Sequence, residues 1–361
     1  MTDDSRLEDV MRGLAFADYP LKGLSAPVLR LDARGRPVVA WRSAERKVIV
    51  RRWEDSAWVT LMSAALSDSD GDFAGLQLDG EGRPLVAMRF PTSIELWRWD
   101  GTRWLGNGGV STAPSYELNR SAHAALACRA SGLCRVAWLA ESKTTPGSVR
   151  MSLHAWSALN KVDFYGGAYD GQASLAHPLV LATNESGASL VSWAEGRSES
   201  PFVTQFKLIS RTGEEKSLPS PTSDALETRP VLALSPADAP TVSWAVRGSL
   251  QVRQWKADAW SSLGERLPTP PEAEPTAFAH ALETTAAGQV LAAWSLPGRV
   301  ELWRWNGSIW TRGVEISRGP SGDTTPWPTL LQGVDEETAY LGWVAYDPSA
   351  RGRVKLRRVV R

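Results

Sequence analysis

The chain has 361 residues, more than twice the ~150 residues of a typical domain, so it holds several domains or one large repeated architecture. Its hydrophobic fraction is 43%, and 40 Lys and Arg balance 40 Asp and Glu, which excludes a disordered or fibrous chain. The balance also argues against nucleic acid as a partner, because phosphate binding needs clustered Lys and Arg. No apolar run approaches the ~20 residues of a spanning helix, so we expect no membrane insertion.

Tryptophan is the unusual component, with 18 residues beside 6 Tyr and 7 Phe. A short apolar phrase, Pro37 to Trp41, returns in six later places. We call the final residues of these phrases the anchors: Trp41, Met88, Trp138, Trp193, Trp244, Trp294 and Trp343. Successive anchors lie 47 to 55 residues apart, so the chain contains seven copies of one unit.

Each copy contains four short segments that have the pattern of β-strands. In the first copy they are Val28 to Leu31, Pro37 to Trp41, Val48 to Trp53 and a segment that starts at Trp58. The segments are rich in Val, Leu and Trp and are bounded by turn residues. Asp and Gly in the first turn, Asp32 to Gly35, are typical turn chemistry rather than a sign of catalysis.

Copies three and four depart from this pattern. Trp156 and Phe206 stand where we expect the tryptophan of the third segment, and the tryptophan of the fourth segment is missing. The loops before these third segments are longer, at Glu141 to Ser148 and Glu195 to Pro201. Loops on a rigid frame carry function, so we expect a ligand to bind on the face with these loops.

Four antiparallel strands in each of seven copies predict an all-β, seven-bladed β-propeller, in which each small sheet packs on the next. We predict a single domain, residues 1–361, with blades at approximately 25–64, 72–110, 122–165, 177–218, 228–266, 278–315 and 327–361. The last copy lacks a fourth segment. Counting back by the spacing of the other copies places it at residues 7–14, so we predict that Leu7 to Leu14 forms the outer strand of the last blade and closes the ring.

The phrase Asp32 to Trp41, together with endings such as Arg98 to Trp104, resembles the repeats of tryptophan-rich seven-bladed propellers in bacterial surface and secreted proteins. It is also similar to propeller lectins. It differs from WD repeats, because Trp99-Asp100 is a single match, and from kelch repeats, because glycine doublets are absent from the expected strand position. The resemblance covers the whole chain and implies the fold and a carbohydrate-binding or protein-binding role, without placing ligand residues.

Three of the four histidines fall just before the first segment of their copies: His123, His177 and His280. If the first strand is innermost, these side chains lie near one mouth of an axial channel. Imidazole binds metals and titrates near neutral pH, so they are candidates for a ligand-binding site. The alternative is that each caps a strand or bonds to a loop. No residues have the spacing of a metal site, and we predict neither a metal nor a cofactor.

Trp97, Trp303 and Trp327 exceed the rule of one tryptophan per strand, which makes them candidates for exposed stacking on a sugar or a partner protein. Glu95 and Glu301 repeat between copies, so we interpret them as structural partners of Arg98 and Arg304 and not as an acid-base pair.

Cys128 and Cys134 flank the turn between the first two segments of copy three. Opposed cysteines in a hairpin can form a disulfide. Two buried free thiols are the alternative. The sequence leaves two localisations open. An oxidised pair indicates an extracellular or cell-surface protein whose signal was trimmed. A chain that is complete as written indicates the cytoplasm.

The sequence favours a non-catalytic binding module whose ligand is a glycan or a protein surface. It predicts a monomer. Two alternatives stay open: an enzyme with an axial site, of the polysaccharide lyase or hydrolase type, and a scaffold domain of a larger surface protein.

Overall fold

A computed structural model provides the structure of the protein. It describes residues 28–32, 34–43, 47–54, 57–65, 72–111, 116–118, 124–129, 133–145, 149–156, 162–164, 169–171, 179–195, 203–222, 230–246, 249–265, 267, 280–296, 299–317, 327–333, 338–346 and 352–360. Every regular element in this part of the chain is a β-strand. Across the same ranges, no helix is long and apolar enough to cross a membrane. Contacts divide the chain into two compact units: a first unit, residues 28–229, and a second unit, residues 230–361 with residues 1–27.

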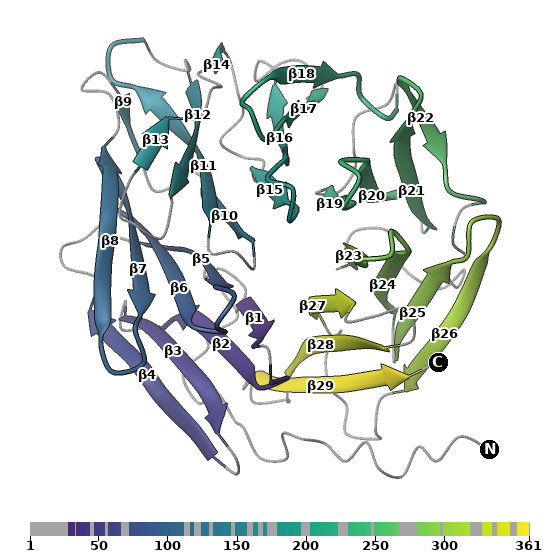
Figure 1. The fold of residues 1–361 in the computed structure, drawn as a ribbon, viewed down its shortest axis with the longest axis horizontal. Helices are drawn as coiled ribbons and strands as arrows, with labels where there is room; N and C mark the ends of the chain where they lie inside the picture. The colour runs from purple at the N-terminus through teal and green to yellow at the C-terminus, as the bar shows by residue number, and fades with distance from the viewer. Residues whose placement is uncertain are drawn as a thin grey trace. The chain divides into compact units, whose positions relative to one another are not determined.

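The first unit contains four antiparallel sheets (Figure 1). Its strands are β1 (Val28–Leu31), β2 (Pro37–Arg42), β3 (Lys47–Glu54), β4 (Ala57–Ala65), β5 (Asp72–Leu78), β6 (Pro84–Arg89), β7 (Ser93–Trp99), β8 (Trp104–Ser111), β9 (Tyr116–Glu117), β10 (Ala124–Cys128), β11 (Cys134–Ser142), β12 (Val149–Trp156), β13 (Val162–Phe164), β14 (Tyr169–Gly171), β15 (Val180–Thr183), β16 (Ser189–Glu195), β17 (Val203–Ile209) and β18 (Glu215–Leu218). The sheets run in the order β1–β4, β5–β8, β10–β13 and β15–β18. The third sheet also takes up β9 beside β11 and β14 beside β12, which fits the irregular sequence of copy three.

The second unit contains three antiparallel sheets. Its strands are β19 (Val231–Leu234), β20 (Pro240–Val246), β21 (Ser249–Lys256), β22 (Ala259–Ser262), β23 (His280–Thr284), β24 (Val290–Leu296), β25 (Arg299–Trp305), β26 (Trp310–Ser317), β27 (Trp327–Gly333), β28 (Thr338–Tyr346) and β29 (Gly352–Val360). The sheets β19–β22 and β23–β26 have four strands, and the sheet β27–β29 has three within the described residues. In both units the first strands of successive sheets contact each other, as β5 contacts β10 and β19 contacts β23.

The predicted pattern of at least four strands in a copy is confirmed for six of the seven sheets within the described residues. The first predicted segment, Val28 to Leu31, is β1, and the anchor Trp41 lies in β2. The prediction for Leu7 to Leu14 lies outside the described residues.

The predicted position of Phe206 is wrong by three residues. In the sheet β23–β26, Glu301 lies opposite the anchor, and the tryptophan Trp305 follows four residues later on the same strand. In the fourth sheet, Gln205 lies opposite the anchor Trp193. Ile209 therefore holds that position in the fourth sheet. Phe206 follows Gln205 directly and is 1% exposed, because strand alternation turns it into the core on the other face of the sheet.

Apolar residues fill the spaces between successive sheets within each unit. Trp138 packs with Leu85 and Leu96 of the preceding sheet, and Trp294 packs with Leu250 and Val252 of the sheet before it. Each large indole can bury about 150–250 Å². Six anchors are therefore core residues, as predicted: Trp41, Met88, Trp138, Trp193, Trp244 and Trp294. The side chain of the seventh, Trp343, lies outside the described part.

Tryptophans of the fourth strands link neighbouring sheets by hydrogen bonds. Trp104 Nε1 donates to the Leu61 carbonyl of the preceding sheet at 2.8 Å, and Trp310 Nε1 donates to the Leu263 carbonyl in the same way. Each indole also packs at an angle on the last tryptophan of its neighbouring third strand, as Trp310 does on Trp305 at 5.5 Å between ring centroids. The same link thus occurs in both units.

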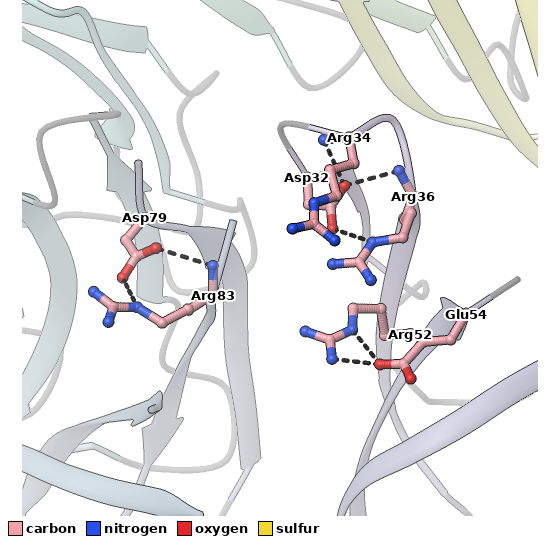
Figure 2. Close-up of polar contacts among 7 residues, drawn as sticks. All are labelled: Asp32, Arg34, Arg36, Arg52, Glu54, Asp79 and Arg83. Carbon is pink, nitrogen blue, oxygen red and sulfur yellow. Dashed lines mark hydrogen bonds and ion pairs between the residues drawn. The ribbon is translucent and has the colours of Figure 1, made fainter. Parts of the chain in front are cut away.

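In several sheets, a polar side chain closes the turn between the first and second strands, as Figure 2 shows for Asp32 and Asp79. Asp32 Oδ1 accepts from the backbone N–H groups of Arg34 and Arg36 at 2.9 Å, and Oδ2 accepts from Arg36 Nε at 2.8 Å. Asp79 makes the same bonds to the backbone and side chain of Arg83. Equivalent turns are closed by Asn184, Ser235 and Thr285. The Asp residues of these turns are turn residues, as predicted.

Asp100 has the same role in the hairpin between β7 and β8. The backbone N–H of Arg103, then the backbone N–H and hydroxyl of Thr102, lower the pKa of Asp100 to about 2. Because this folded-state pKa lies below the ordinary value of about 3.9, the carboxylate stabilises the fold above about pH 4. The contribution is lost as the pH falls from about 4 to about 2. We expect an NMR titration of the Asp100 carboxyl to show this low pKa, and urea unfolding of an Asp100→Asn variant to lose part of the pH dependence of the free energy over that range.

Candidate functional site

A cavity of about 470 Å³ lies on the sheet β19–β22. Gln251, Val252 and Arg253 of β21 line it, together with Ser262, Gly264 and Glu265 at and beyond the end of β22. Gln251 and Arg253 are half-buried, whereas the residues from the β22 side are exposed. The volume falls within the usual range for small-molecule sites, about 300–1,000 Å³.

The cavity lies beside the end of β22, which is short. β22 has four residues, whereas the equivalent β4 has nine and β26 has eight. Beyond it the Leu263 N–H still bonds to the Val252 carbonyl at 3.0 Å, and the chain then leaves β21 until Leu267 pairs with Leu250. Gly264 makes this departure, with a φ of +70°, and an added Cβ would lie 2.7 Å from the Trp305 ring. The loop therefore requires glycine for its backbone conformation and for space.

The anchors are covered by flat side chains of the third strands. These pairs are Arg51 over Trp41, His154 over Trp138, Arg253 over Trp244 and Trp303 over Trp294. The guanidinium carbon of Arg253 lies 5.8 Å from the ring centroid of Trp244, which is 1% exposed. A cation over an indole face is attracted by the ring quadrupole, so Arg253 rests on a fixed aromatic base.

The polar groups of the cavity provide both kinds of hydrogen-bonding partner. Arg253 only donates, Glu265 in its ionised form only accepts, and Gln251 and Ser262 do both. Such a mixed set suits a ligand rich in hydroxyl groups, because each sugar hydroxyl donates one hydrogen bond and accepts others. These residues were not predicted as a site from the sequence. Gly264 was the available signal, because it interrupts the fourth segment soon after Trp260.

No protein-family model matches the chain, and no curated protein matches it. Among solved structures, the polysaccharide lyase Uly1 is similar with a TM-score of 0.58 and 9% identity over 92% of this chain and 89% of that chain. YCF48 bound to D1 peptide is similar with a TM-score of 0.52 and 13% identity over 95% of this chain and 94% of that chain. The SapL1 lectin, in complex with alpha methyl fucoside, gives a TM-score of 0.47 and 11% identity over 82% of this chain and 98% of that chain.

The first two likenesses show the fold at identities too low to show more. The chain has a β-propeller-type fold. This agrees with the antiparallel sheets of both units and with the fold class predicted from the repeats.

Of the three histidines predicted as candidates for a ligand-binding site, one lies within the described residues. His280 opens β23, is half-buried, and has its ring Nε2 3.2 Å from the Ser243 carbonyl of the preceding sheet. This contact is to the strand β20, whereas the alternative was that the histidine caps a strand or bonds to a loop, so a ligand-binding role of His280 stays a prediction. His123 and His177 lie outside the described residues. Within the described residues, no group of three or more His, Cys, Asp or Glu side chains could hold a metal.

Trp97 and Trp303, the candidates for exposed stacking, lie on the third strands β7 and β25, and ligand stacking on them stays a prediction. Both are half-buried, because they cover the anchor position of their own sheets. Their indole N–H groups donate to carboxylates on the same strand face, Trp97 to Glu95 at 3.2 Å and Trp303 to Glu301 at 3.0 Å. Trp327 opens β27, and its side chain lies outside the described part.

Glu301 also accepts a hydrogen bond from Arg312 of the neighbouring strand β26. The sequence interpretation assigned Glu95 and Glu301 to Arg98 and Arg304. It overlooked strand alternation, which turns residues three positions apart to opposite faces of a sheet. Their role as structural partners is confirmed, with different partners.

Cys128 and Cys134 lie opposite each other at the ends of β10 and β11, with their sulfur atoms 2.02 Å apart. The structure thus contains the disulfide, the first of the two alternatives. In this turn Arg129 stands where Asp32 and Asp79 close theirs. Its Nη1 donates to the Glu185 carbonyl of the next sheet at 3.2 Å. The disulfide therefore closes a hairpin in which an arginine stands at the position of the polar residue that closes the equivalent turns.

We expect a Cys128→Ser/Cys134→Ser variant to lose about 2 kcal/mol of unfolding free energy, because the cross-link restricts the unfolded chain over a short loop. Urea unfolding of the variant and of the wild-type protein, with and without reductant, measures this. Reduced wild-type protein should match the variant. Alkylation of both cysteines in denatured protein purified without reductant would instead support two free thiols.

Proposed function

We propose that the protein is a non-catalytic binding module that recognises a glycan at the cavity of the sheet β19–β22. The observation that carries this proposal is the cavity, where Gln251, Arg253, Ser262 and Glu265 present donors and acceptors on a sheet with a packed core. The cavity volume of about 470 Å³ is in the range of small-molecule sites and leaves room for part of a saccharide. Rigid strands support such recognition because they hold the polar groups in place before the ligand binds.

A glycan array followed by titration of the intrinsic tryptophan fluorescence tests this proposal on the full chain. The informative variant is Ser262→Phe, which fills the cavity from an exposed position. Ser261→Phe is the matched control, because Ser261 is also exposed but does not line the cavity. We expect wild-type protein and Ser261→Phe to bind the same saccharides, and Ser262→Phe to bind them at least about tenfold more weakly.

Absence of any saccharide response in the wild-type protein would overturn the proposal and favour a protein partner. Release of new reducing or unsaturated sugar ends during incubation would show an enzyme instead. The similarity in fold to the polysaccharide lyase Uly1 is the reason to test for such activity.

A further inference from the structure

The cavity sheet differs in charge from its neighbour at two equivalent positions. In β25, Glu301 lies opposite the anchor and Trp303 follows two residues later. In β21 the same positions hold Gln251 and Arg253. A neutral amide thus replaces the carboxylate, and a guanidinium replaces the indole. At these two positions together, the sheet β19–β22 has one positive group and no negative one, whereas the sheet β23–β26 has one negative group and no positive one.

This guanidinium has a defined position. Its central carbon lies over the Trp244 ring, 5.8 Å from the centroid, and the N–H donors of a guanidinium lie in its plane and point outward from that carbon. Residues that are held in place before binding lose less conformational entropy when the ligand arrives. Arg253 is therefore suited to bind a planar anion along its donor edge.

The sheet β1–β4 shows what an arginine does at this position. Arg51 is the equivalent of Arg253, and its Nε donates to Thr60 Oγ1 on the opposite strand at 3.2 Å. Ser262 lies opposite Arg253 in the same register. The hydroxyl of Ser262 and the amide of Gln251 add two further donors to the guanidinium that lines the cavity.

We propose that the glycan bound in this cavity carries a carboxylate, as in a uronate residue, and that Arg253 binds it. This inference rests on the proposed function and names its ligand class. A guanidinium and a carboxylate form two parallel charge-assisted hydrogen bonds. An uncharged sugar would also displace water from the guanidinium, but it has no negative charge to offset the cost of that desolvation. Glu265 accepts from the sugar hydroxyls. The chain has no net charge, so recognition depends on this local group and not on a long-range field.

The experiment compares trigalacturonic acid with its methyl ester, which has the same sugar rings and no carboxylate charge. Binding to the full chain is measured by calorimetry for the wild-type protein, Arg253→Gln and Arg51→Gln. Arg51→Gln is the matched control, because Arg51 covers its anchor in the same way and does not line the cavity. We expect the acid to bind at least about tenfold more tightly than the ester, a preference that Arg253→Gln abolishes and Arg51→Gln retains.

Salt dependence of the wild-type protein gives a second test that does not depend on the variant folding. Raising the salt from about 50 mM to about 500 mM should weaken binding of the acid and leave the ester unchanged. Equal binding of acid and ester, or a preference that survives in folded Arg253→Gln, overturns this inference. If neutral saccharides bind and Ser262→Phe blocks them, the proposed function stands alone. If no saccharide binds, both proposals fail, and acidic peptides become the ligands to test.

Discussion

Replacing Trp294 by alanine is expected to lower the free energy of unfolding by about 3–5 kcal/mol, among the largest effects of any single substitution in the chain. Trp294 is 1% exposed and packs between the sheets β19–β22 and β23–β26. Trp303 stacks on it with ring centroids 5.7 Å apart and planes inclined by 8°. The variant loses the transfer free energy of the indole and leaves a cavity that Trp303 and Leu250 cannot fill by themselves.

Urea unfolding followed by circular dichroism measures this change. Ile309→Ala is the control, because Ile309 is 59% exposed and its removal should alter the free energy by no more than about 0.5 kcal/mol. Equal destabilisation by the two variants would contradict the placement of Trp294 in the core.

We expect a proline at Val10 to expose β29 to hydrogen exchange and to destabilise the chain by about 2 kcal/mol or more. The reason is the predicted strand at residues 7–14. The sheet β27–β29 has three strands within the described residues, and the other six sheets have at least four. The start of an outer strand precedes the first strand of the next sheet by 15 to 21 residues, as β26 precedes β27. The same interval before β1 begins at residues 7 to 13.

Charge supports this pairing. The sequence of β29 contains Arg353, Lys355, Arg357 and Arg358 and no acidic residue. Residues 7–14 contain Glu8 and Asp9 and one basic residue, Arg12, so their net charge is negative. Opposite charges on paired strands stabilise a sheet. A proline removes one N–H from the ladder and cannot take part in its hydrogen bonding.

Hydrogen exchange with mass spectrometry tests this prediction in the full chain. In the wild-type protein, peptides that cover residues 7–14 and 352–360 should both be protected, and Val10→Pro should lose protection in both. Thr2→Pro is the control, because it lies before the predicted strand. Fast exchange of residues 7–14 in the wild-type protein would rule out the pairing, and protection that depends on protein concentration would indicate a second copy of the chain.

The strands were predictable from the sequence because each copy repeats the same local signals. The anchor marks the second strand, the Asp or Asn with Gly marks a turn, and the paired tryptophans such as Trp305 and Trp310 mark a hairpin. Such signals are local, and their repetition averages out the errors of single segments. The prediction was wrong where it depended on register, as for Phe206, because one residue of shift turns a side chain to the other face.

The site was harder to predict because it arises from a departure from the repeat. The cavity depends on where β22 ends, and that depends on Gly264 and on the space left by Trp305 in the next sheet. The role of Arg253 appears only when the copies are aligned on their anchors. In each third strand, one residue lies opposite the anchor, as Gln251 does. The second residue after it, which is Arg253 in this copy, is Arg, Trp or His in most copies. The candidates chosen from the sequence, Trp97 and Trp303, occupy this position and are therefore covers of the anchors.

The hydrogen bond from Trp310 to the Leu263 carbonyl places an indole proton beside the loop that follows β22, where Gly264 and Glu265 line the cavity. A molecule that enters the cavity and shifts this loop must change the surroundings of that proton. The protein therefore carries its own spectroscopic reporter: in a ¹⁵N-labelled sample the Trp310 indole resonance should move on ligand addition, while the corresponding Trp104 signal in the first unit stays in place.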